Sequence, residues 1–253
     1  MIVLMNWWAP YSKASITSAI NLGHRVCVIV SDSDNEGEGF LNDYHVTEDI
    51  NKLKQRDYNQ IILIRDSEPR NSKAAHTLTR FDYLPEVLSR VIEPVLVTDA
   101  DVIFQRKLDI PSVHDIALWW PDARPWNEVE DYARHHAFPL WWSELANTIY
   151  AEAMYFSGTA MALDFANRIK VYVDSLRADG YGDRWGVDQV AIACAARRLP
   201  KKYICPLNAG QPDVATSPDA AIWFPHPHER DNLQSAWNQA RANLLNSPKG
   251  DRQ

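Results

Sequence analysis

Residues 95–104 read VLVTDADVIF, an apolar run that is interrupted by two aspartates. Four apolar or β-branched residues lead directly to Asp99 and Asp101, which stand two positions apart. In an extended chain this spacing puts both carboxylates on one side of the backbone. Because ligands of open α/β sheets bind beyond the carboxyl ends of the strands, we predict a buried strand over 95–98 that ends in a ligand site.

The aspartate pair favours a metal site. Two carboxylates at one strand end repel each other unless a cation lies between them. Carboxylate oxygens suit Mg²⁺ or Mn²⁺, and either ion can hold a diphosphate and offset the charge of a departing nucleotide. A solvated turn without metal is the simpler interpretation of an isolated Asp-x-Asp. The buried strand before the pair and the apolar residues 102–104 after it favour the metal site.

The residues before this stretch alternate between strand and helix patterns. Continuous apolar runs predict buried strands at 2–8, 25–30 and 61–64. Helical patterns lie between them at 12–21 and at 71–90, the latter with a candidate break near Pro85. This alternation is typical of βαβ units, so we expect an α/β fold whose mostly parallel central sheet is flanked by helices.

The second half is more mixed, but it contains no linker that would separate two domains. Strands are predicted at 115–120, 154–164 (with a glycine kink), 203–207 and 221–224. Helices are predicted at 165–178, 187–197 and 233–245. We therefore predict one domain over 1–253, with a nucleotide-binding half (1–110), an acceptor and donor-sugar half (111–245) and a tail (246–253).

Composition excludes several functional classes. The formal net charge of −7 argues against a nucleic-acid partner and against binding to an anionic membrane. No segment reaches the roughly 20 apolar residues of a membrane span. The start of the chain, MIVLMNWWAP, lacks a basic region and a cleavage site, so we interpret it as a strand. Three cysteines without paired spacing fit a reducing cytoplasm.

Several stretches together resemble the family-8 glycosyltransferases, which are retaining enzymes with the GT-A fold. The central block is RFDYLP at 80–85 followed by VLVTDADVIFQRKLD, where an arginine-bearing helix precedes the Asp-x-Asp strand. The other stretches follow in the family's order: NWWAPYSKASITSAINLG, MYFSGTAMALD, WGVDQ at 185–189, KYICPLN and IWFPHP. The match spans roughly residues 1–230.

The resemblance implies a hexosyltransferase that uses a UDP-sugar donor and Mn²⁺ (or Mg²⁺). Tyr11 corresponds to an aromatic residue that stacks on the base, although packing at the start of a helix is an equal interpretation. The implied metal ligands are Asp99, Asp101 and His226, with His228 as the alternative histidine. GT-A enzymes of both stereochemical kinds carry Asp-x-Asp, so retention or inversion stays open.

Four further residues are candidates from their positions. Asp32 ends the second predicted strand, where an acid can bind a base or ribose. Arg80 precedes the metal strand and could reach phosphate or the aspartate pair. Asp188 and Gln189 lie at a predicted helix start; Asp188 is either a cap or a ligand of donor sugar or acceptor, and Gln189 would lie near the anomeric carbon.

The chain departs from the family in two places. The late His-x-x-Gly-x-x-Lys-Pro-Trp pattern is not evident after Phe224, and Phe156 stands where the family has a donor-sugar-binding asparagine. A group of tryptophans could line an acceptor-sugar cleft or fill a core: Trp119, Trp120, Trp126, Trp141 and Trp142.

Two other functions compete with glycosyl transfer. Phosphatases of the haloacid-dehalogenase kind also carry an apolar strand followed by Asp-x-Asp, with the first aspartate as nucleophile. Their motif usually lies near the N-terminus, and Ile103 matches its later residue poorly. The third function is nucleotide-sugar binding without catalysis.

Overall fold

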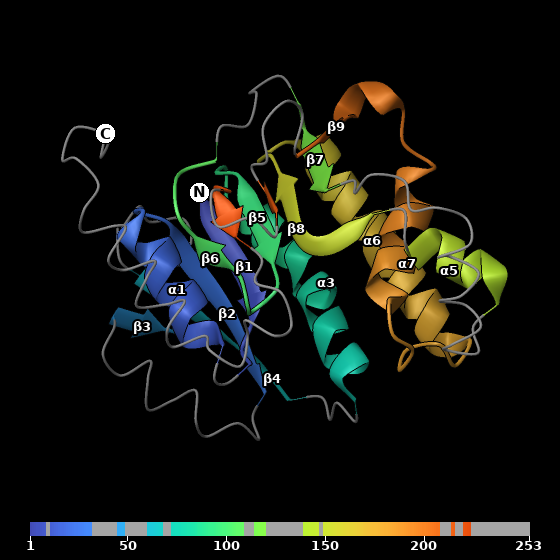
Figure 1. The fold of residues 1–253 in the computed structure, drawn as a ribbon, viewed down its shortest axis with the longest axis horizontal. Coiled ribbons are helices and arrows are strands. Elements are labelled where there is room, and N and C mark those ends of the chain that lie inside the picture. Colours follow the sequence, from blue (N-terminus) through green and yellow to red (C-terminus); the bar gives the residue numbers. More distant parts are fainter. Residues whose placement is uncertain are drawn as a thin grey trace.

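The computed structural model describes residues 1–8, 11–31, 45–48, 60–67, 72–108, 114–119, 139–146, 149–207, 214–215 and 220–223. An eight-stranded sheet spans this part of the chain (Figure 1). Its strands, in order across the sheet, are β3 (His45–Thr47), β4 (Gln60–Asp66), β2 (Arg25–Ser31), β1 (Ile2–Asn6), β5 (Val95–Thr98), β8 (Tyr150–Phe156), β7 (Ile116–Trp119) and β9 (Ile204–Pro206).

The sheet is mostly parallel, as predicted. Strands β3, β4, β2, β1 and β5 pair in parallel, and so do β7 and β9. Strand β8 runs antiparallel to both of its neighbours, β5 and β7. A small second sheet contains β10 (Val214–Ala215), β11 (Ile222–Trp223) and β6 (Ile103–Phe104).

Helices cover both faces of the large sheet (Figure 1). Helix α1 (Ser12–Asn21) lies on one face, and α3 (Lys73–Arg90), α6 (Ala160–Ala178) and α7 (Val187–Ala196) lie on the other. The other helices among the described residues are α5 (Leu140–Ala146) and the short 3₁₀ helix η2 (Lys201–Tyr203). No helix among the described residues combines the length and apolarity needed to cross a membrane.

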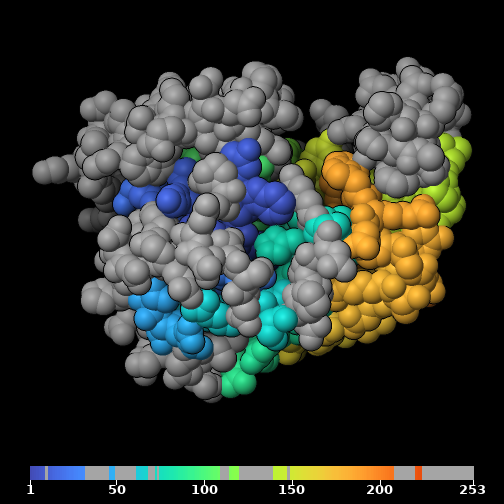
Figure 2. Space-filling model, turned by 90° about the horizontal axis from the view of Figure 1, so that it is seen from below, coloured from blue at the N-terminus to red at the C-terminus, as the bar shows by residue number. Residues whose placement is uncertain are grey.

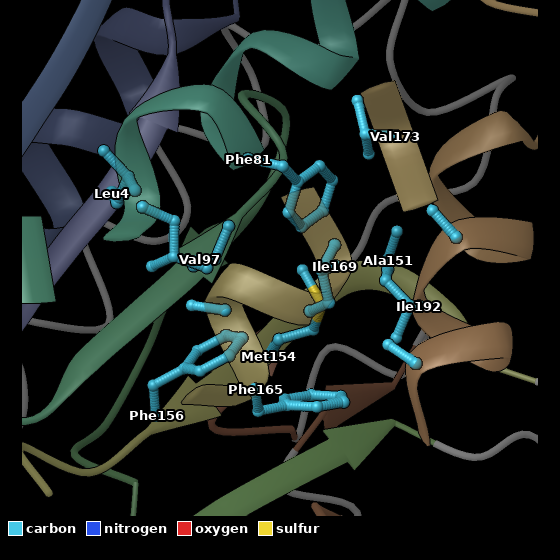
Figure 3. Close-up of a cluster of buried hydrophobic side chains, with 14 of the residues drawn as sticks. Leu4, Phe81, Val97, Ala151, Met154, Phe156, Phe165, Ile169, Val173 and Ile192 are labelled. Carbon is cyan, nitrogen blue, oxygen red and sulfur yellow. The ribbon is translucent and has the colours of Figure 1, made fainter. Parts of the chain in front are cut away.

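Burial on both faces explains the continuous apolar runs. In β1, Ile2 and Leu4 pack with α3, α6 and α7, whereas Val3 and Met5 pack with α1. A strand with two buried faces has no polar side, so its sequence does not alternate. Figure 3 shows the first of these two layers, where side chains from β1, β5 and β8 meet those of α3, α6 and α7.

The candidate break at Pro85 does not occur. Helix α3 continues through Pro85 to Arg90, although proline cannot donate the usual backbone hydrogen bond. Phe81, Leu84 and Leu88 of this helix are buried against the sheet, and their burial offsets the lost bond. Strand β3 is an element that the sequence patterns did not predict.

The predicted strand at 154–164 is wrong beyond its third residue. Strand β8 starts earlier, at Tyr150, and ends at Phe156; the Thr159 hydroxyl then caps α6 by accepting a hydrogen bond from the Ala162 N–H at 3.3 Å. Gly158, taken as a strand kink, lies against the chain before β5. A Cβ atom at this glycine would be 2.2 Å from the Ile92 carbonyl oxygen.

We expect Gly158→Ala to reduce the free energy of unfolding by about 2 kcal/mol or more, because the added methyl group meets backbone that cannot move aside. Urea denaturation measures the change. Gly182→Ala is the matched control, since its Cβ would meet the flexible Arg177 side chain at 3.0 Å. Equal stability of the two variants would contradict the close approach at Gly158.

Candidate functional site

A cavity of about 200 Å³ opens at the sheet edge where β1 and β5 end. Because β8 is antiparallel to β5, its first residues reach the same edge, and the Asp99 N–H donates a 3.1 Å hydrogen bond to the Glu152 carbonyl. The starts of α3 and α7 complete the walls. Figure 2 shows the start of α3 (teal) between the N-terminal residues (blue) and the α6–α7 region (yellow to orange).

The cavity brings together six of the eight predicted site residues, from four separate parts of the chain: Tyr11, Arg80, Asp99, Asp101, Asp188 and Gln189. The other two, Asp32 and His226, lie outside the described residues, as does His228. Tyr11 also packs against the small cluster formed by Ala14, Ile103 and Trp223, so its position serves the core as well as the cavity.

Helix α3 presents polar side chains to the cavity at helical spacing. The Ser72 hydroxyl begins the helix by accepting a hydrogen bond from the Ala75 N–H at 3.1 Å. Arg80 lies four residues after His76 and three after Thr77, so all three side chains can line the same side of the helix. The sequence before the Asp-x-Asp strand therefore supplies one wall of the site.

Arg80 is the electrostatic centre of the cavity. Its side chain is 1% exposed; one guanidinium nitrogen donates to Asp99 Oδ1 and the other donates to Asp188 Oδ2 at 2.9 Å. Burial opposes the charged form, but the two carboxylates outweigh burial and raise the pKa of Arg80. Arg80 thus contacts the first aspartate of the pair, and its contact with a phosphate group stays a prediction.

Asp188 lies at the start of α7, after Gly186, whose φ of 74° is in the left-handed region. Its Oδ1 accepts the Gln189 N–H at 2.8 Å, and its Oδ2 accepts from Arg80. Burial raises the pKa of Asp188, against the opposing effect of Arg80. Each carboxylate oxygen therefore accepts a hydrogen bond, which lowers the nucleophilicity of Asp188.

Sequence reasoning missed Glu152. This acid lines the cavity from β8, and burial, followed by the nearby charge of Asp99, raises the pKa of its carboxyl to about 8. The available signal was a lone acid in the apolar run YAEAMYF at 150–156, which the predicted start of the strand at 154 excluded.

The interpretation of Phe156 as the replacement for a sugar-binding asparagine is wrong. Phe156 pairs with Val95, the first residue of β5, and therefore lies at the end of β8 that is remote from the cavity. It is fully buried and stacks on Phe165, with ring centroids 5.9 Å apart (Figure 3). The same strand presents Glu152, four residues earlier, to the cavity.

Residues around the cavity carry buried polar atoms that find no hydrogen-bond partner within the described residues. Burial of such atoms is costly, so they mark a place for a polar ligand or water. The atoms are Asn6 Oδ1, Arg80 Nε, Thr98 Oγ1, Glu152 Oε2 and Gln189 Oε1.

The lining is acidic. The described lining contains one basic side chain of the Lys or Arg type, that of Arg80. It contains four carboxyl groups: Asp99, Asp101, Glu152 and Asp188. This excess of acid suits a cation. No three His, Cys, Asp or Glu side chains in the described part of the chain are grouped as a complete metal site.

The chain resembles solved structures in its fold, but not known proteins in its sequence. No protein-family model and no curated protein sequence matches the chain. Solved structures do match, each with 12% sequence identity: the glycosyltransferase GlyE of Streptococcus pneumoniae TIGR4 (TM-score 0.52), a glycosyltransferase involved in glycosylation of the major capsid of PBCV-1 (0.50), and an LgtC active-site mutant with glutamine replaced by glutamate (0.53).

These matches extend along almost the whole chain. They cover 96%, 94% and 98% of it, respectively. In the other direction the chain spans 62% of GlyE, a little under two thirds, and 98% of each of the other two proteins. At this identity the likeness shows the fold alone, and it confirms the predicted α/β fold of GT-A glycosyltransferases.

We expect Arg80→Met to lower the free energy of unfolding by about 3–5 kcal/mol, because it leaves Asp188 buried without its counter-charge. Urea denaturation measures the loss. Adding Asp188→Asn to this variant should restore part of the stability, and Arg80→Lys, which can reach fewer partners, should lie between the wild type and Arg80→Met. An unchanged stability of Arg80→Met would refute the central role of the ion pair between Arg80 and Asp188.

The raised pKa of Glu152 gives a pH prediction for the metal-free protein. Between the ordinary pKa of 4.5 and the folded value of about 8, the folded state keeps a proton that the unfolded state releases. Stability present below about 4.5 is therefore lost as pH rises through about 8. Glu152→Gln removes this loss, so its advantage over the wild type in urea denaturation should grow with pH; a constant difference would count against the shift.

Proposed function

We propose that this protein is a glycosyltransferase that moves a sugar from a UDP-sugar to an acceptor hydroxyl, with retention of the anomeric configuration. One observation carries the proposal. In a chain with a glycosyltransferase fold, Asp99 and Asp101 end a central parallel strand and line one cavity with Arg80, Asp188 and Gln189. Ligands of such sheets bind at this edge.

The proposal includes a divalent cation, Mn²⁺ or Mg²⁺, held by Asp99, Asp101 and His226. The two described ligands fit it: their hard oxygen donors line one cavity whose wall is rich in carboxyl groups. When bound, the ion supplies positive charge against the diphosphate of the leaving nucleotide. His226 enters as the third ligand from the sequence resemblance.

The chain's own residues fix the reacting groups. Arg80 holds Asp99 and Asp188 in place from a fully buried position, so both carboxylates are oriented before the substrate binds. Tyr11 contributes an aromatic face to the cavity, and we propose that the nucleobase stacks on it. The unpartnered Oε2 of Glu152 can accept hydrogen bonds from donor-sugar hydroxyls.

Retention is proposed to occur by attack on the face that the nucleotide leaves. Both Asp188 oxygens accept hydrogen bonds, and Gln189 is a neutral amide, so neither is a good candidate for a covalent intermediate. The acceptor oxygen bonds to the anomeric carbon while the bond to phosphate breaks and UDP leaves with its electron pair. The acceptor's proton passes to the departing phosphate oxygen.

The fold favours this function over its two competitors. A phosphatase of the haloacid-dehalogenase kind needs a nucleophilic first aspartate, but Asp99 is paired with buried Arg80 in a fold shared with glycosyltransferases. A protein that binds nucleotide-sugars without turnover would have the same cavity. Turnover therefore separates it from the proposed enzyme.

A screen of UDP- and GDP-sugars for Mn²⁺-dependent hydrolysis tests the function, with the anomer of the released sugar read by NMR. We expect slow hydrolysis of a UDP-sugar, with the released sugar first formed in the donor's anomeric configuration. Binding of UDP without hydrolysis of any donor would establish the inactive binder, and an inverted product would overturn retention.

We expect Asp101→Asn to abolish most hydrolysis and to weaken UDP binding only when Mn²⁺ is present, because it removes a charged ligand of the ion. Calorimetry with and without Mn²⁺ measures the binding. Asp164→Asn is the control, since this exposed acid pairs with Arg168 on the outer face of α6. Full activity of Asp101→Asn would end the proposed role of the pair.

A further inference from the structure

Trp185 combines exposure with a place at the cavity. Its side chain is 53% exposed, yet it lines the cavity together with Gly186, Asp188 and Gln189. Other large apolar side chains exposed among the described residues, such as Trp141 and Val171, do not line it. An exposed indole at the edge of a polar cavity offers an apolar surface that a ligand can cover.

The backbone beneath Trp185 is held on both sides. Its carbonyl accepts a 3.1 Å hydrogen bond from the indole N–H of Trp142, which is itself fully buried. On the other side, a Cβ atom at Gly186 would lie 3.1 Å from the Ala146 methyl and 3.3 Å from Gln189 Oε1, so this turn is closely packed. The exposed ring therefore stands on a fixed support.

The chemistry beside the ring suits a carbohydrate. A sugar ring has an apolar face of C–H groups and an edge of hydroxyl groups. The indole of Trp185 offers an apolar face, and Gln189, four residues along, has an amide oxygen that is buried and lacks a hydrogen-bond donor within the described residues. Hydroxyl groups donate to such an oxygen, whereas phosphate oxygens cannot.

We propose that Trp185 is the platform of the acceptor subsite and that the acceptor is a carbohydrate whose ring stacks on this indole. The inference rests on the proposed function and names the acceptor class for the same cavity. The nucleobase is proposed to stack on Tyr11, which enters the cavity from the chain after β1 rather than from the start of α7. We therefore assign Trp185 to the second substrate, the acceptor.

The sequence-based group of acceptor tryptophans changes accordingly. Trp142 is fully buried, and Trp119 packs on Tyr150 with ring centroids 4.9 Å apart, outside the cavity lining. Trp141 is 47% exposed but does not line the cavity. Trp120 and Trp126 lie outside the described residues.

Saturation-transfer NMR on the full chain with UDP and Mn²⁺ tests the inference, using lactose, maltose, cellobiose and N-acetyllactosamine as probes. We expect at least one saccharide to bind. Trp185→Ala should weaken that binding at least about tenfold, and Trp185→Phe, which keeps a ring, should retain most of it. Trp141→Ala is the matched control and should bind like the wild type, because this tryptophan is similarly exposed but does not line the cavity.

UDP binding and donor hydrolysis by the same variants distinguish failure of the acceptor inference from failure of the proposed function. Trp185→Ala should keep the wild-type affinity for UDP. If the wild type hydrolyses a donor but binds none of the four saccharides, or if Trp185→Ala binds them as the wild type does, the acceptor inference is wrong while the proposed function stands. Weaker UDP binding by Trp185→Ala would assign the ring to the nucleotide instead. If the wild type neither binds UDP nor hydrolyses a donor, the proposed function itself fails.

Discussion

The buried guanidinium of Arg80 is the interaction on which the site depends. It joins three parts of the chain that are far apart in sequence: helix α3, the turn after β5 and the start of α7. A buried cation is stable only if carboxylates and good geometry compensate for the water it has lost. Asp99 and Asp188 provide that compensation, so the three elements can pack only in the arrangement that brings their polar ends to one cavity.

This arrangement also limits what each acid can do. Arg80 offsets part of the charge of Asp99 and Asp188, while Asp101 adds a further carboxylate to the same lining. The remaining negative potential favours a cation over a free anion. A diphosphate would be repelled by this wall alone, so the proposed nucleotide donor requires the proposed metal ion.

Much of the fold and of the candidate site could be predicted from the sequence, because local patterns and sheet geometry agree. The strand leading to Asp99 is apolar because both faces are covered, and parallel strands bring their polar ends to one edge. Glu152 could not be placed in this way. Its strand is antiparallel, so its first residues rather than its last ones meet the cavity, and no local pattern encodes that direction. A glycine before a helix and a glycine within a bent strand also have the same sequence signature, which explains the error at Gly158.

The antiparallel setting of β8 has a consequence for how this region can vary among related chains. Side chains alternate along a strand, so Met154 and Phe156 share one face while Ala153 and Tyr155 pack on the other. Losing or gaining a single residue between Ala153 and Phe156 would exchange the two faces over part of the strand and would shift Glu152 relative to the cavity edge. Exchanges of amino-acid type preserve this alternation, whereas changes of length do not, so evolutionary drift in β8 is confined to the former.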